Sequence, residues 1–246
     1  MQTITKTYQT YQFEELDDKA KEQVLESYRT DEWYPGDWWH EAAVEDFVED
    51  RTKEGWDLKT KDVHFDVSYC QGSGASFDGT VNCLEWIKFH KLEADYPTIV
   101  KILSDKKSWD LDGNIHSNHY ANHYCHFNTR YLEIEEDGQL EEYIYGWDNE
   151  KKEQPIIDGW NTELLELEKA IEADREQLSR DLEKTMYKEY EHYMSDETIT
   201  EEIIVNTEKR FLANGTPFNE WKTRTKPRIM GTLTWQITPE WNVWTT

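Results

Sequence analysis

The sequence predicts an α+β protein in which acidic helices pack on a small antiparallel sheet. Residues 62–69 alternate between apolar and polar side chains, which is typical of a half-buried strand. Residues 161–194 instead repeat apolar side chains at helical spacing, so one long helix is expected there. Aromatic residues make up 14% of the 246 residues, and this share argues against disorder, because disordered acidic chains are poor in aromatic residues.

We expect a single α+β domain over residues 1–246. It divides into four regions by composition and pattern. These are an acidic helical region (1–57), a sheet-rich centre (58–135), a long acidic helix followed by a short helix (156–208), and a basic strand tail (209–246).

Two helices are predicted in the N-terminal region. Residues 14–29 carry apolar side chains at helical spacing, and acidic residues in the first turn suit the positive end of the helix dipole. Pro35-Gly36 indicates a turn. The second helix is expected from about residue 38 to 54, where Gly55 ends it.

The centre is expected to contain two stranded units. The strand at 62–69 is followed by the glycine-rich turn 71–77, and residues 76–84 are predicted as its partner strand in a hairpin. Residues 95–104 predict a short helix with a proline in its first turn. A second stranded unit is expected over about 113–135.

The long helix near 161–194 is the clearest predicted element. Ser195 is expected to cap a short helix that runs to about residue 206. The tail is predicted to hold strands near 208–213 and 229–237.

The negative charge is concentrated in two blocks. The net charge is −25, with 16 acids and 5 bases in residues 13–57 and 25 acids and 7 bases in residues 133–208. Residues 58–132 are nearly neutral, with 9 acids and 8 bases. Such a field attracts basic partners and repels nucleic acid and anionic membranes, so neither is expected to bind directly.

Carboxylates spaced along a helix can approximate a row of phosphates. A helix rises about 1.5 Å per residue, and duplex DNA carries one charge per about 1.7 Å of its axis. The alternative, a merely solvated face, stays open. The candidate partner-binding carboxylates are Glu41, Glu45, Asp46, Glu49, Asp50, Glu163, Glu166, Glu172, Asp174, Glu176, Asp181 and Glu183.

Three tryptophans near the start of the second helix allow two interpretations. Trp33, Trp38 and Trp39 suit a core seam between the first two helices, which is the favoured interpretation. Clustered tryptophans also serve as binding anchors, so Trp38 and Trp39 are retained as partner-binding candidates.

Histidine and cysteine gather in residues 116–126, but their spacing matches no standard zinc motif. On a hairpin these side chains would point to opposite faces. We therefore expect no bound metal and no cofactor. If a metal is bound, the candidate ligands are His119, His123, Cys125 and His126.

The glycine-rich turn 71–77 could hold an anion through its backbone N–H groups. It lacks the lysine of a phosphate-binding loop, so a tight turn between strands is favoured.

Four cations alternate along the predicted tail and would lie on one side of an extended segment. They could bind nucleic acid or, as we favour, form salt bridges with acidic helices of this chain or of a second copy. They are Lys222, Arg224, Lys226 and Arg228.

No secretion signal or membrane span is evident, since no stretch approaches about 20 apolar residues. The three cysteines are widely spaced and odd in number, which suits reduced thiols in a cytosol better than disulfides.

Several blocks together resemble a known family of sequences. They are residues 11–16, 37–39, 71–77, 123–126 and 193–197. The set resembles small acidic α+β proteins encoded mainly by bacteriophages and related mobile elements, with no established common activity. The resemblance is scattered over residues 8–215 and implies a phage accessory protein that acts in the cytoplasm of a bacterial host.

These observations lead to one favoured function and two alternatives. We expect a phage-encoded, non-enzymatic inhibitor that binds a basic, nucleic-acid-handling host defence protein through a DNA-mimicking acidic surface. An antitoxin-like or regulatory binding protein with a target that does not handle nucleic acid is the first alternative. A metal-dependent enzyme that uses the His/Cys cluster is the second, and homodimer formation stays open.

Overall fold

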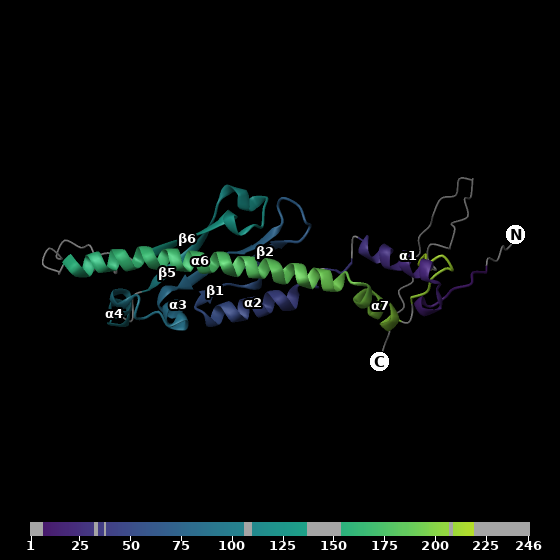
Figure 1. The fold of residues 1–246 in the computed structure, drawn as a ribbon, viewed down its shortest axis with the longest axis horizontal. Coiled ribbons are helices and arrows are strands. Elements are labelled where there is room, and N and C mark those ends of the chain that lie inside the picture. Colours follow the sequence, from purple (N-terminus) through teal and green to yellow (C-terminus); the bar gives the residue numbers. More distant parts are fainter. Residues whose placement is uncertain are drawn as a thin grey trace, which may run out of the picture. The chain divides into compact units, whose positions relative to one another are not determined.

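The fold is α+β, as the sequence predicts (Figure 1). The computed structural model describes residues 7–31, 34–36, 38–105, 110–136, 154–206 and 209–218. Contacts group the chain into a central unit, residues 28–200, and a terminal unit, residues 1–27 with 201–246. Each is described by itself, and the single domain over the whole chain stays a prediction.

The central unit contains two small antiparallel sheets. The larger sheet has the strand order β1-β4-β5-β6, with β1 at Trp56–Asp57, β4 at Thr80–Asn82, β5 at Leu111–Ser117 and β6 at Arg130–Glu136. The smaller sheet pairs β2, Val63–Asp66, with β3, Gly74–Phe77.

The predicted second stranded unit is the hairpin of β5 and β6. The two strands pair from Leu111 opposite Glu136 to Ser117 opposite Arg130. The loop between them holds two 3-10 turns, η3 at His119–Asn122 and η4 at Phe127–Thr129. The His/Cys segment therefore lies mostly on this loop and not on a strand.

The predicted hairpin is present, but its second strand covers residues 74–77 and not 76–84. β3 ends at Phe77 and pairs with β2, whereas β4 joins the other sheet and is followed by helix α3, Cys83–His90. The side chain of Asn82 caps α3 by accepting a hydrogen bond from the Glu85 N–H at 3.0 Å. Three residues of α3 are buried at helical spacing: Cys83, Trp86 and Ile87. The apolar run here is short and is equally compatible with a strand, so the sequence pattern did not reveal the helix.

The predicted strand at 62–69 is also too long. β2 ends at Asp66, whose carboxylate accepts a hydrogen bond from the Ser68 N–H at 2.7 Å and turns the chain. Tyr69 follows with a φ of 55° and is 65% exposed. The helices α2, Glu41–Lys53, and α4, Pro97–Asp105, lie close to their predicted positions.

The long helix α6, Gln154–Tyr193, is confirmed and begins earlier than predicted. The proline in its first turn does not interrupt it, because the first N–H groups of a helix need no helical partner. Figure 1 shows α6 running along the central unit, where it packs against α2, α4, β3 and β6. Its buried apolar stripe consists of Trp160, Leu167, Ile171, Leu182 and Met186.

Arg175 interrupts this apolar stripe and is fully buried. Its guanidinium donates two hydrogen bonds of 2.7 Å to the carboxylate of Glu172 and one of 3.2 Å to the Phe127 carbonyl. Glu172 also accepts from the Leu132 N–H of β6 at 3.1 Å. The pair therefore ties the middle of α6 to the sheet and to η4.

The terminal unit joins segments from both ends of the chain. The 3-10 turn η1, Phe13–Glu15, precedes α1, Asp18–Arg29, so the first predicted helix starts later than expected. Phe211 forms isolated bridges with Tyr11 and Pro217, where a strand at 208–213 was predicted. Gly215, with a φ of 82°, approaches α1 so closely that a Cβ would lie 2.4 Å from the Ala20 carbonyl oxygen.

The short predicted helix after Ser195 is α7, Asp196–Val205. The Ser195 hydroxyl accepts a hydrogen bond from the Thr198 N–H at 3.3 Å, as expected of a cap. The strand predicted at 229–237 and the four alternating cations of the tail lie outside the described residues.

Replacing Glu172 with Gln should destabilise the central unit by about 3 kcal/mol, because the buried guanidinium of Arg175 then lacks its counter-charge. Glu176→Gln is the matched control, since its pair with Arg180 lies on the surface and should contribute less than about 1 kcal/mol. Urea unfolding followed by circular dichroism measures both. Equal losses for the two variants would contradict the anchoring role of the buried pair.

Candidate functional site

A groove of about 430 Å³ lies between α2 and α6. Four carboxylates from the two helices line it: Asp46, Asp50, Asp181 and Glu189. Arg51 is the cation among its lining residues, and Phe47, Leu178 and Leu182 supply apolar surface. Three of the carboxylates predicted from sequence, Asp46, Asp50 and Asp181, thus meet here from segments about 130 residues apart.

Lysines partly neutralise the groove at its exposed edges. Lys53 lies 3.0 Å from Asp50, and Lys184 lies 2.8 Å from Asp181. Hydrogen bonds from Gln177 and then Lys184 lower the pKa of Asp181, so this carboxylate is ionised at neutral pH. Exposed pairs of this kind contribute little, so a cationic partner can replace the lysines at small cost.

A further row of carboxylates covers the outer side of α2. Glu41, Glu45 and Glu49 follow one another at four-residue spacing, and all three are exposed. On α6, Glu166 is exposed and Glu183 is half-buried. These predicted residues therefore lie on the surface without lining the groove, as does Glu176, which pairs with Arg180 at 2.8 Å.

Three other predicted carboxylates have partners inside the protein. Glu163 accepts hydrogen bonds of 2.8 and 3.0 Å from the Thr98 and Ile99 N–H groups and so caps α4. Glu172 holds Arg175, as described above. Asp174 accepts a hydrogen bond of 2.9 Å from the indole N–H of Trp86. These three carboxylates therefore hold elements of the fold together, and they are less suited to partner binding than the exposed ones.

The two tryptophans before α2 occupy different environments. Trp39 packs edge-to-face against Phe65 and Tyr190, with ring centroids 5.7 and 5.6 Å away, and joins the hydrophobic core. The ring of Trp38 packs edge-to-face against Tyr193, but Trp38 is 52% exposed. Trp39 is thus part of the core, but its ring packs on β2 and α6, whereas a seam between the first two helices was predicted; Trp38 remains available as an anchor. Trp33 lies outside the described residues.

The glycine-rich turn packs against the His/Cys loop. A Cβ on Gly74, whose φ is 151°, would lie 3.0 Å from the Cα of His126, and one on Gly72 would lie 2.8 Å from the Tyr124 ring. This close packing is the physical reason for glycine at both positions, and it fits the tight-turn interpretation. A pocket of about 480 Å³ beside them is lined by Gln71, Asn118, Tyr120, Tyr124, His126, Asn128 and Thr129.

The candidate metal ligands of this loop do not converge. Within the described part of the chain, His119, His123, Cys125 and His126 form no group of three whose ligand atoms lie within 4.8 Å of one another. His126 accepts a hydrogen bond from the Asn128 N–H at 3.3 Å and so caps η4. Burial raises the pKa of the Cys125 thiol, which disfavours a thiolate ligand.

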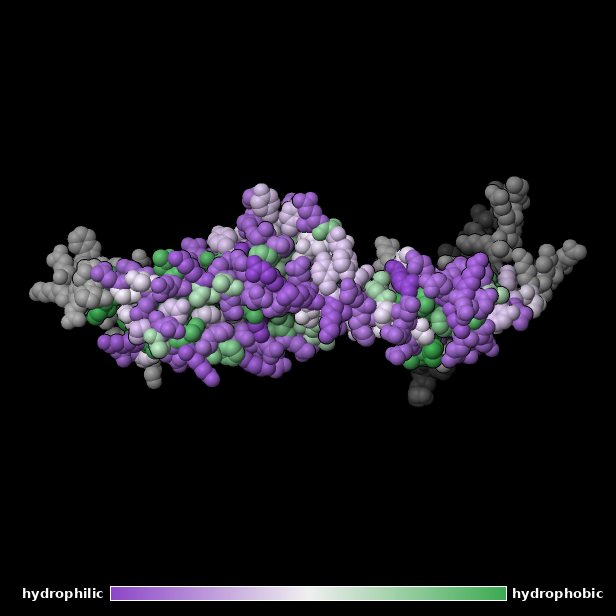
Figure 2. Space-filling model, viewed as in Figure 1, coloured by the Kyte–Doolittle hydropathy of each residue, from purple (hydrophilic) through white to green (hydrophobic). Residues whose placement is uncertain are grey.

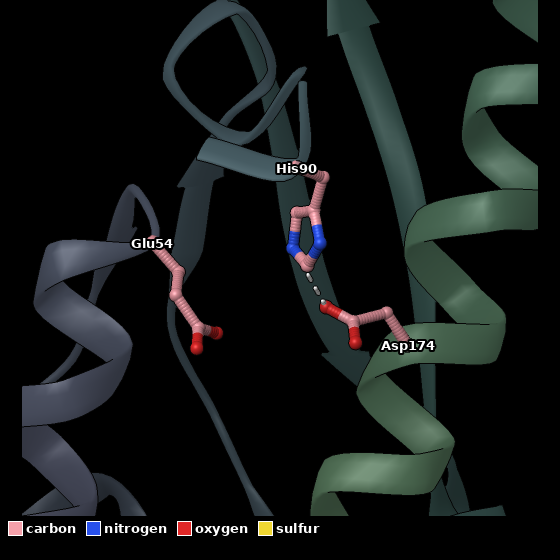
Figure 3. A group of neighbouring side chains, drawn as sticks. All are labelled: Glu54, His90 and Asp174. Atoms are coloured by element: carbon pink, nitrogen blue, oxygen red, sulfur yellow. Dashed lines mark ion pairs between the residues drawn. The ribbon is translucent and has the colours of Figure 1, made fainter. Parts of the chain in front are cut away.

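A different group of metal-ligating side chains does converge, as Figure 3 shows. Glu54 follows the end of α2, His90 ends α3 and Asp174 lies in the middle of α6. One ligand atom of each lies within 4.8 Å of the others, and the His90 Nε2 is 3.9 Å from the Asp174 Oδ2. Sequence reasoning missed Glu54 and His90, because the three positions share no local spacing.

A second polar network holds the base of the His/Cys loop. Asp78 accepts hydrogen bonds from the Arg130 Nε at 2.6 Å and from Ser117 at 3.4 Å, and lies 2.8 Å from the His64 Nε2. Arg130 is 5% exposed and also donates to the Thr129 hydroxyl at 2.8 Å. Burial acts to raise the pKa of Asp78, but hydrogen bonds from His64 and Arg130 outweigh it and lower the pKa.

A family described as a domain of unknown function, DUF8835, matches residues 39–196. The chain belongs to this family. The matched region spans α2 to α6 and almost coincides with the central unit. The groove, the Glu54/His90/Asp174 group and the His/Cys loop therefore all lie within the DUF8835 domain.

No curated protein and no solved structure matches the chain. Within the described residues, none of the helices combines the length and the apolar content that crossing a membrane requires.

Replacing Asp78 with Asn should destabilise the DUF8835 domain by about 3 kcal/mol at neutral pH, because the buried Arg130 loses its counter-charge. The lowered pKa of Asp78 means that its stabilising effect is full above the ordinary value of 3.8 and is lost as the pH falls through the lowered pKa. The difference from wild type should therefore be constant near neutrality and shrink below about pH 4.

Denaturant unfolding across this pH range measures the effect, with Asp105→Asn, a change at an exposed carboxylate, as the control. If the deficit of Asp78→Asn were unchanged at acidic pH, the ion pair with Arg130 would not be its cause.

Proposed function

We propose that this protein is a non-enzymatic inhibitor that binds a basic, nucleic-acid-handling protein through the acidic groove between α2 and α6. The observation that carries the proposal is the convergence of Asp46, Asp50, Asp181 and Glu189 on one groove. Four carboxylates face a single guanidinium among its lining residues, so the groove attracts cationic side chains.

The spacing of charge on α2 supports mimicry of a nucleic-acid backbone. Five carboxylates lie within residues 41–50, a length of about 15 Å at the rise of an α-helix. This amounts to one charge per about 3 Å, close to the 3.4 Å per phosphate of one DNA strand. These carboxylates lie on two sides of α2, with Asp46 and Asp50 in the groove and Glu41, Glu45 and Glu49 on the outer side, so a cationic surface that wraps around the helix would meet all five.

The surface around the groove suits a polar partner with a few apolar contacts. Figure 2 shows a visible face that is largely hydrophilic over the central unit, with scattered apolar patches. Phe47, Leu178 and Leu182 in the groove and the exposed ring of Trp38 offer contacts that would fix the position of a partner. Ion pairs would supply attraction, and these side chains would supply specificity.

The biological setting belongs to the same proposal. The sequence blocks that resemble phage accessory proteins suggest a phage-encoded inhibitor that acts on a host defence protein in the bacterial cytoplasm. An antitoxin-like or regulatory protein is the competing function, and its partner would have no need of a strongly cationic groove.

The triple variant Asp46→Asn, Asp50→Asn, Asp181→Asn should bind its partner about tenfold more weakly, because each exposed ion pair contributes about 0.2–1 kcal/mol. Immobilised wild-type and variant proteins are incubated with a bacterial lysate, and the retained proteins are quantified by mass spectrometry at two ionic strengths. We expect the wild type to retain basic nucleic-acid-binding proteins at low salt and to release them at high salt.

The matched control neutralises three exposed carboxylates outside the groove, Asp57, Glu93 and Asp105. It changes the net charge equally, so it should retain the partner if the groove is the binding surface. Equal losses of the retained partner in both variants would show that binding depends on the net charge of the protein and not on the groove. A partner that stays bound at high salt, and that binds the groove variant as tightly as the wild type, would instead favour the antitoxin-like function.

A further inference from the structure

Among the described residues, two buried polar atoms of the Glu54/His90/Asp174 group find no hydrogen-bond partner. They are the Oε2 of Glu54 and the Nε2 of His90. Glu54 is only 9% exposed, so its carboxylate cannot rely on bulk water. An unpaired buried polar atom is unfavourable by about 1–3 kcal/mol, and more if it is charged. One ligand bound among the three side chains would satisfy both atoms.

The charges of the group favour a cationic ligand. Two carboxylates and an imidazole converge from the end of α2, from α3 and from α6, with their ligand atoms within 4.8 Å of one another. Figure 3 shows Glu54 and Asp174 on either side of the His90 ring. A divalent cation would neutralise both carboxylates at once.

The donor set selects the kind of cation. Imidazole and carboxylate are ligands of Zn²⁺ and of neighbouring transition metals, whereas Mg²⁺ and Ca²⁺ prefer sets made only of oxygen. The 3.9 Å between the His90 Nε2 and the Asp174 Oδ2 is compatible with one ion about 2.0–2.2 Å from each atom. The ligand atom of Glu54 lies within 4.8 Å of the other two, which makes it the third candidate ligand.

Neighbouring side chains already orient the two carboxylates. The indole N–H of Trp86 donates to the Asp174 Oδ2 at 2.9 Å, and the Arg51 guanidinium lies 3.0 Å from the Glu54 Oε1. The ring of Trp86 also packs on His90, with centroids 4.4 Å apart. Support of this kind is typical of metal sites, where it fixes ligand orientation.

We propose that Glu54, His90 and Asp174 bind one divalent transition-metal ion, Zn²⁺ in the first instance, and thereby link α2, α3 and α6. Three protein ligands leave a further coordination position for water or another ligand. The site lies within the DUF8835 domain and does not depend on the groove function proposed above.

The test is calorimetric titration of the chelator-treated full-length protein with Zn²⁺ in excess Mg²⁺, which occupies nonspecific carboxylates. We expect one equivalent of Zn²⁺ to bind and to raise the Tm, because a ligand that binds only the folded state stabilises it. His90→Ala should weaken binding about 100-fold or more, since even neighbours of metal ligands contribute 10–100-fold. His119→Ala, at an exposed histidine of the His/Cys loop, should leave binding unchanged.

Glu54→Gln keeps the test decisive if His90→Ala fails to fold. It preserves shape but removes the counter-charge of Arg51, so without metal its Tm should fall below that of wild type, while the Zn²⁺-dependent rise in Tm should be lost. The proposal is overturned if Zn²⁺ does not bind stoichiometrically, or if Glu54→Gln retains the Zn²⁺-dependent rise. Loss of binding in His119→Ala with retention in His90→Ala would also overturn it.

Discussion

The buried guanidinium of Arg175 constrains how the long helix α6 lies on the sheet. A charge in the middle of the apolar stripe of α6 must find acceptors, and Glu172 and the Phe127 carbonyl supply them. Because Glu172 also accepts from the Leu132 N–H, the helix has one position and one rotation on the sheet. The groove with α2 and the approach of Asp174 to His90 both follow from that rotation.

The same helix uses its carboxylates in two ways. Those that face the sheet, α3 or α4 meet N–H donors, as Glu163, Glu172 and Asp174 do. Those that face α2 or solvent are exposed or pair with exposed lysines, as Asp181 does with Lys184. Position around the helix, and not the density of acidic residues, therefore separates a carboxylate that stabilises the fold from one that can bind a partner.

Periodicity predicts the elements that are long or strongly patterned. The α+β class, the long helix α6, helix α4 and the β5–β6 hairpin could all be predicted, because each repeats one period over many residues. Helix α3 could not, since a short apolar run is equally compatible with a strand. The exact end of β2 depends on a hydrogen bond that the Asp66 carboxylate accepts from the Ser68 N–H, and no periodicity reveals it.

The candidate sites depended on contacts between distant segments. Three of the four acidic residues of the groove were predicted from charge and Glu189 was not, and their meeting at one place required the packing of α2 on α6. Nothing in the spacing of Glu54, His90 and Asp174 indicates that they converge, because they come from the end of α2, from α3 and from α6. Charge predicts which residues are available to a partner, and only the fold predicts which of them act together.

Competition with duplex DNA tests the central claim most directly. A short DNA duplex, applied at constant ionic strength to the immobilised protein after it has captured its partner, competes for the same cationic groove of that partner. We expect the partner to elute with the DNA, as mimicry of a phosphate backbone requires. A partner that stays on the column while the DNA passes through would contradict mimicry, because the two surfaces would then bind at different places.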